Sequence, residues 1–259
     1  LGAYYMKGTD SADLFDRLLI STRPKERKHR NQYQVVFIDF SRMPDFCGNY
    51  QEYITNVIDN MKSDLCEAYP ALREKTYRSI SQMFVDTKDT FIFIMDEWDC
   101  VFGQSFMMEE QKVSYLQFLK GLLKDQPYVG LAYMTGVLPI AKYASGSELN
   151  MFVEYHAMND HVFERYFGMT DDEVKRLCAT EKNVSYVELR YWYDGYYLSD
   201  GSRLFNPRSV HCALENGVCQ NYWTQTGPMN EIADCVEHNV DEVREDLVKM
   251  ASGIPVEAD

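Results

Sequence analysis

Several common sequence features are missing from this chain. No apolar run approaches the roughly 20 residues that a membrane-spanning helix needs, and no signal-peptide pattern opens the sequence. The seven cysteines are scattered and odd in number, so we expect reduced thiols and a cytoplasmic protein. Basic residues are few, because 26 lysines and arginines stand against 40 acids and give a net charge of -14. Such a surface repels phosphate backbones, which disfavours nucleic-acid binding by the surface as a whole.

A phosphate-binding loop is also missing. The motif G-x-x-x-x-G-K-[ST] cannot be placed, because neither Gly-Lys-Ser nor Gly-Lys-Thr occurs in the sequence. The backbone amides and the lysine of such a loop offset the charge of a triphosphate, so we expect no tight nucleotide binding by residues 1–259 alone. The chain opens at Leu1 without a Met, on what looks like the end of a helix capped by Gly8. We therefore expect a fragment of a longer protein.

What the sequence does contain is a buried strand that ends in two acids. Residues 90–96 are apolar, β-branched and aromatic, and Asp96 is followed directly by Glu97. The carboxyl ends of such strands are where open α/β sheets bind ligands. This is the form of a Walker B segment, in which Asp96 holds Mg²⁺ through water and Glu97 orients or deprotonates an attacking water. The alternative is a strand that ends in a solvated acidic turn.

Residue periodicity predicts the elements around this strand. Further strands of the same texture are expected at 34–40 and 129–134, with a candidate fourth strand at 151–155. Apolar residues at helical spacing predict helices at 12–20, 50–69, 71–84 and 109–124. The basic stretch within 21–32 is interpreted as a solvated loop. Because strands and helices alternate, we predict an α/β fold with a parallel sheet and right-handed crossovers.

The second part of the chain has a different residue pattern, in which short stretches of apolar residues at helical spacing alternate with polar turns. Helices are expected at 159–167, 170–180, 184–193, 208–215 and 239–251. We therefore divide the chain into a core at 1–156 and a mostly helical lobe at 157–259. An aromatic cluster between Tyr186 and Tyr197 is interpreted as core or lobe-interface packing rather than base stacking. Asp194 and Gly195, within that cluster, are interpreted as a turn.

Thr135 adds a third polar group to the predicted site. It follows the strand at 129–134, and parallel strands end at the same edge of a sheet, so it is expected near Asp96. A hydroxyl at that position can sense a γ-phosphate. Zinc is disfavoured, because Cys212 and Cys219, the closest pair of cysteines, have six residues between them. A nuclease site is disfavoured as well, because Glu110 and Lys112 fall in a helical pattern where that chemistry needs a strand.

Seven short pieces of the sequence carry a resemblance to a known family. The chain is similar, from residue 1 to about residue 230, to the bacterial AAA-ATPase-like family, whose members often carry a PD-(D/E)XK nuclease-like domain downstream. The pieces, in the order of the family, are Leu14–Asp16, Ile94–Asp99, Met134–Val137, Phe167–Val174, Trp192–Tyr196, Phe205–Pro207 and Tyr222–Gly227.

The resemblance implies a P-loop NTPase-like parallel sheet flanked by helices, with a helical C-terminal lid lobe. Carried over by position, it implies Asp96 as the Walker B acid, Glu97 as the catalytic base and Thr135 as the strand-end sensor, with ATP and Mg²⁺ bound by the full-length protein. The family's phosphate loop would lie just upstream of Leu1, and its nuclease-like domain would follow residue 253. Arg208 departs from the family, which usually has an aromatic there. That arginine is either a cationic contact to the nucleotide or a surface residue at a helix start.

Two functions remain open at this point. One is an ATP-binding and ATP-hydrolysing regulatory module, inactive as truncated here, with nucleic acid bound only by the missing downstream domain. The other is a non-catalytic interaction module on a degenerate NTPase fold. The implied sheet would lack the strand between residues 129–134 and the segment near 152, which leaves backbone groups unpaired. We therefore expect a strand-donating partner, a homo-oligomer or a displaced fourth strand.

Overall fold

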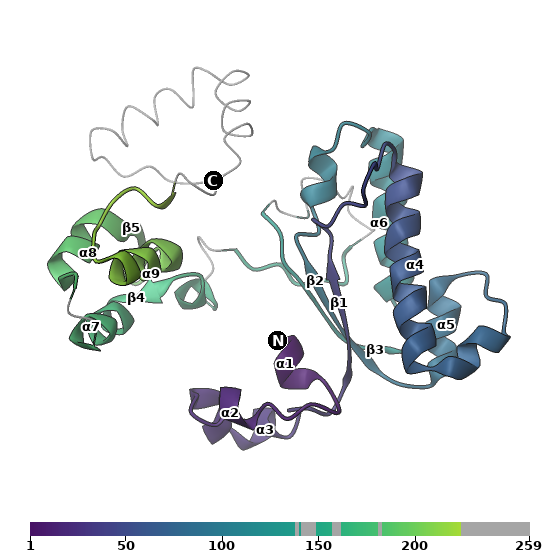
Figure 1. Ribbon diagram of the computed structural model, residues 1–259, viewed down its shortest axis with the longest axis horizontal. Helices are drawn as coiled ribbons and strands as arrows, with labels where there is room; N and C mark the ends of the chain where they lie inside the picture. Colours follow the sequence, from purple (N-terminus) through teal and green to yellow (C-terminus); the bar gives the residue numbers. More distant parts are fainter. Residues whose placement is uncertain (138–139, 141–148, 157–161, 181–182, 224–259) are drawn as a thin grey trace. The chain divides into compact units, whose positions relative to one another are not determined.

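The computed structural model describes residues 1–137, 140, 149–156, 162–180 and 183–223, and the chain divides into two compact units, Leu1–Glu154 and Tyr155–Asp259 (Figure 1). Each unit has a hydrophobic core of its own. None of the helices in the described ranges is both long and apolar enough to cross a membrane.

The first unit contains a parallel sheet of three strands. Strands β1 (Gln34–Asp39), β2 (Phe91–Asp96) and β3 (Val129–Met134) lie in the order β1-β2-β3, so β2 is central. The predictions of strands at 34–40, 90–96 and 129–134 and of a parallel sheet are confirmed. The register pairs Asp39 with Asp96, which brings the ends of β1 and β2 to one edge of the sheet.

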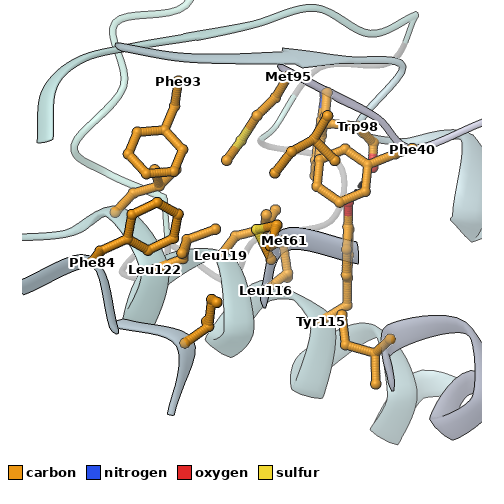
Figure 2. Close-up of a cluster of buried hydrophobic side chains, with 14 of the residues drawn as sticks. Phe40, Met61, Phe84, Phe93, Met95, Trp98, Tyr115, Leu116, Leu119 and Leu122 are labelled. Atoms are coloured by element: carbon orange, nitrogen blue, oxygen red, sulfur yellow. Dashed lines mark hydrogen bonds between the residues drawn. The ribbon is translucent and has the colours of Figure 1, made fainter. Parts of the chain in front are cut away.

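Three helices cover one face of this sheet (Figure 1). They are α4 (Tyr50–Ala68), α5 (Ile80–Thr87) and α6 (Glu109–Leu123), close to the predicted ranges except that α5 is shorter. Figure 2 shows Phe93 and Met95 of β2 pointing toward three leucines of α6, and all five side chains are buried. Removing this apolar surface from water is the main stabilising term of the unit.

The opposite face of the sheet carries two apolar rows. Because side chains alternate along a strand, the register places Val35 beside Ile92 and Leu131, and Phe37 beside Ile94 and Tyr133. The short helix α1 (Gly2–Tyr5) packs on this side, where Gly2 lies close to the Ile94 side chain. The outer members of the rows nevertheless stay exposed, at 57% for Phe37, 42% for Leu131 and 47% for Tyr133.

The predicted fourth strand at 151–155 is wrong. Met151 and Phe152 form a turn and a bend, and both side chains pack against the core of the first unit. The apolar side chains of this segment therefore pack against the core, although the segment pairs with no strand among the described residues. Within the described residues, β3 pairs with β2 on one side and has no strand on its other side.

Two predicted helices are interrupted. In place of a helix at 12–20 there are α2 (Ala12–Phe15) and a 3₁₀ helix at Leu19–Thr22, and the loop that follows contains α3 (Pro24–Arg27). In place of a helix at 71–84 there is a 3₁₀ helix at Pro70–Glu74, and α5 begins only after Ser79. The Ser79 side chain accepts a hydrogen bond from the Gln82 amide, and this N-cap starts a new helix.

The second unit combines helices with a small antiparallel sheet. Helices α7 (Asp171–Thr180), α8 (Tyr186–Tyr193) and α9 (Pro207–Asn216) agree with the predicted ranges. Only a 3₁₀ helix at Glu164–Tyr166 is described within 159–167, and the helix predicted at 239–251 lies outside the described residues. Strands β4 (Met169–Thr170), β5 (Asp194–Tyr197) and β6 (Arg203–Phe205) pair in the order β4-β6-β5. This sheet could not be predicted from the sequence, because its strands are too short to show a period.

Candidate functional site

Asp96 and Thr135 meet at the carboxyl edge of the parallel sheet. Asp96 is the last residue of β2, and Thr135 directly follows β3. The Thr135 amide donates to the Met95 carbonyl at 2.9 Å, which extends the pairing of the two strands, and the Thr135 hydroxyl donates to the Asp96 carboxylate. The Asp96 side chain is exposed and Thr135 is half-buried. Two of the predicted site residues are thus in direct contact.

Glu97, the residue predicted as the base, has an unusual backbone. Its φ is 51°, in the left-handed region that a residue with a side chain seldom occupies. This conformation costs about 1–2 kcal/mol for a residue other than glycine. Its carbonyl accepts from the Cys100 amide at 3.0 Å in the turn that follows, and its side chain is exposed beside Asp96. Backbone strain of this kind is frequent at functional sites, so the conformation of Glu97 is consistent with a functional role.

The turns after β2 and β3 are joined by further contacts. The Trp98 amide donates to the Thr135 carbonyl at 3.1 Å, and Trp98 itself is buried and held by a hydrogen bond of 2.8 Å from the Tyr115 hydroxyl to its carbonyl. The carboxylate of Asp99 accepts from the Val137 amide, with the nitrogen 3.0 Å from Oδ2 and 3.2 Å from Oδ1. Asp99 was not among the predicted site residues.

Asp39 is a second acid at this edge of the sheet, and it was not among the predicted site residues. It ends β1 in register with Asp96, and it accepts from the Ser41 hydroxyl at 2.6 Å, the Ser41 amide at 3.1 Å and Arg42 Nε at 3.0 Å. The Ser41 hydroxyl, together with the Ser41 amide and Arg42, lowers the pKa of the Asp39 carboxyl against the opposing effect of burial. An acid at the end of an apolar run was the signal that identified Asp96, and the same signal marks Asp39.

Arg208 belongs to the second unit. It is the second residue of α9, after Pro207, and its side chain is exposed. The helix is capped by Asn206, whose side chain accepts from the Ser209 amide at 2.9 Å. This placement fits a surface residue at a helix start, and the nucleotide contact proposed for Arg208 stays a prediction.

The aromatic cluster divides between core and surface. Tyr193 is buried, as predicted, but Tyr191 is 85% exposed. The expected turn at Asp194 is wrong, because this residue begins β5 and its carboxylate is 1% exposed. Its charge is balanced by ion pairs with Arg203 and with Arg190, whose Nε lies 3.4 Å away. Asp194 is therefore buried within reach of two arginines, and these ion pairs hold the first residue of β5 in place.

Oxygen donors at the sheet edge suit Mg²⁺, which binds proteins through one or two carboxylates and keeps several waters. The exposed Asp96 carboxylate and the Thr135 hydroxyl are donors of that kind. Among the residues that the structure describes, no group of three or more His, Cys, Asp or Glu side chains is placed to enclose a metal ion. Two further candidate zinc ligands in the sequence, Cys235 and His238, lie outside the described residues. Glu110 and Lys112 do lie in a helix, α6.

Comparison with protein families places these observations in context. The sequence profile of a family described as predicted AAA-ATPases matches residues 1–144, and the chain belongs to this family. The matched range contains the whole parallel sheet together with Asp96, Glu97 and Thr135, and it ends before the second unit. Searches among curated proteins and among solved structures find no match.

Proposed function

We propose that this chain is the ATP-binding and ATP-hydrolysing core of a AAA-ATPase-like regulatory module. The observation that carries the proposal is the contact between Asp96 and Thr135 at the carboxyl edge of a parallel sheet, within the range that matches the family. A strand-end carboxylate that is exposed and held by a neighbouring hydroxyl is arranged to receive a hydrated cation. Membership of the family supports the general expectation that ATP and Mg²⁺ are used.

In this proposal each residue has one task. Asp96 would hold Mg²⁺ through the water shell of the ion, and the ion would supply charge neutralisation at the phosphates. Glu97 takes the proton of the attacking water or orients that water. Thr135 contacts the γ-phosphate and keeps Asp96 in place. The strained backbone of Glu97 supports its part, because that conformation aims the side chain at the cost of stability.

The proposal needs a phosphate loop, which residues 1–259 do not contain. We propose that the loop and its strand lie upstream of Leu1 in the full-length protein and that the strand pairs with the open edge of β3. This edge of β3, which pairs with no strand within the described residues, supports this placement. A strand from a second copy or another partner would satisfy the same edge. The second unit would act as the lid, and a nuclease-like domain would follow it.

The test measures Mg²⁺-ATP binding and turnover by the full-length protein. Glu97→Gln should keep binding and lower turnover at least about 100-fold, because general-base catalysis contributes that much or more. Glu110→Gln on the exposed start of α6 is the matched control and should leave both unchanged. Failure of the wild-type protein to bind Mg²⁺-ATP would refute the proposal.

The second candidate is a non-catalytic interaction module. It is favoured by the lack of a Gly-Lys-Ser or Gly-Lys-Thr sequence and by the exposed apolar side chains on β1 and β3. It predicts that the residues encoded before Leu1 also lack a phosphate loop. Sequencing the part of the gene that precedes the codon for Leu1 would therefore distinguish the two proposed functions.

A further inference from the structure

Asp99 is a buried acid next to the proposed site. Its exposed fraction is 7%, and burial of a carboxylate is unfavourable unless hydrogen bonds compensate it. The Val137 amide supplies such a bond, with its nitrogen within 3.2 Å of both oxygens. Bonds from a backbone N–H to a carboxylate are stronger than those between neutral groups. The acid therefore fixes the backbone two residues beyond Thr135.

Gly136, between Thr135 and Val137, shows how closely the two turns approach. A Cβ atom at this position would lie 2.5 Å from the Trp98 ring and 2.6 Å from Asp99 Oδ1, which no real Cβ tolerates. The backbone of residue 136 thus lies directly against Trp98 and Asp99, and glycine is the residue that permits the approach. Thr135, Gly136 and Val137 are each held by the turn that follows β2.

We propose that Asp99 is a positioning residue for Thr135. By holding the Val137 amide it fixes the 135–137 turn, and the turn holds the Thr135 hydroxyl against the Asp96 carboxylate. The catalytic consequence rests on the proposed function, because it needs an Asp96–Thr135 pair that works on ATP. Partners that orient a catalytic or metal-binding group typically change activity by about 10- to 100-fold when they are removed.

The experiment combines two readouts on the full-length protein. Hydrogen exchange, followed by mass spectrometry on a peptide spanning residues 134–137, reports the turn without any need for ATP. Asp99→Ala should speed exchange there about 10-fold or more, since a charged hydrogen bond is lost. Asp99→Asn keeps one side-chain oxygen as acceptor, so it should restore most of the protection. Turnover should follow the same order, with kcat about 10- to 100-fold lower in Asp99→Ala and KM for ATP changed less than about threefold.

Glu164 in the second unit offers a matched control. It is 6% exposed and also accepts from a backbone amide, that of Ser199 at 3.1 Å, so it resembles Asp99 in burial and bonding. Glu164→Ala should lower stability but leave exchange at residues 134–137 and kcat unchanged. Should Asp99→Ala fail to fold, Gly136→Ala, which displaces the same turn, carries the test.

Unchanged exchange at residues 134–137 in folded Asp99→Ala would overturn the positioning role, and if that variant does not fold, unchanged exchange in Gly136→Ala would overturn it. An equal fall of kcat in the Glu164 variant would also overturn it, because the loss would then come from stability alone. If the wild-type protein does not hydrolyse ATP, the proposed function fails. The exchange readout still decides whether Asp99 holds the turn, so the two failures are distinguishable.

Discussion

Asp96 is the last residue of strand β2, whereas Asp194 follows helix α8 and begins strand β5, and the surroundings of the two aspartates differ. The Asp194 carboxylate is buried, and its charge is compensated by ion pairs with two arginines of the second unit. Asp96 is exposed, and the partner observed for it is the neutral hydroxyl of Thr135. The difference teaches that the charge of an acid paired with arginine is compensated within the fold, whereas an exposed acid that is held by a hydroxyl keeps its charge for a ligand. Each of the following predictions tests that contrast.

The largest effect is expected at the buried acid. Asp194→Asn removes the charge that Arg190 and Arg203 pair with, and because these arginine side chains are 50% and 32% exposed, water compensates part of the loss, which we expect to be about 2 kcal/mol. Denaturant unfolding should show this loss, while Asp96→Asn should change the free energy of unfolding by less than about 0.5 kcal/mol, as exposed substitutions do. Asp200→Asn removes an exposed pair with Arg165 and is the matched control, with a loss below about 1 kcal/mol. Equal losses in the free energy of unfolding in all three variants would contradict the contrast between Asp194 and Asp96.

A smaller effect of opposite sign is expected at Glu97. Glu97→Gly relieves the left-handed backbone and should raise the free energy of unfolding by about 1 kcal/mol. Glu97→Ala removes the same carboxylate but keeps a Cβ, so its stability should match the wild type. Both variants should lose turnover in the full-length protein. A glycine variant that is less stable than the alanine variant would show that the residue is not strained.

The smallest effect concerns pH and Asp39, whose environment lies between the two extremes. Its pKa is lowered in the folded state, so its contribution to stability is present above the unfolded value of about 3.9 and is lost as the pH falls below it. The denaturant midpoint should therefore fall more steeply below about pH 4 in the wild type than in Asp39→Asn. Asp45→Asn, at an exposed position of the same loop, should keep the wild-type slope. Parallel curves for wild type and Asp39→Asn would contradict the prediction.

The parallel sheet and the meeting of Asp96 with Thr135 could be predicted, because apolar strand texture and the common edge of parallel strands are local signals. Asp39 carried the same signal and was overlooked. The break before α5 was also readable, since Ser79 and Gln82 have the spacing of a helix start. Asp99 could not be assigned, because its role depends on a contact with Val137, 38 residues away. Strands β4, β5 and β6 form by pairing with one another, and the sequence of one short segment carries no signal of such pairing.

The burial of Trp98 against Gly136 gives the protein an optical reporter of its own. The other two tryptophans, Trp192 and Trp223, belong to the second unit and are about 40% exposed or more. An indole shielded from water fluoresces at shorter wavelength than an exposed one, so the emission of Trp98 separates from theirs. Replacing Trp192 and Trp223 by phenylalanine would leave Trp98 as the single tryptophan, next to the turn that bears Thr135. Its spectrum would then register any ligand that shifts this turn, without a label.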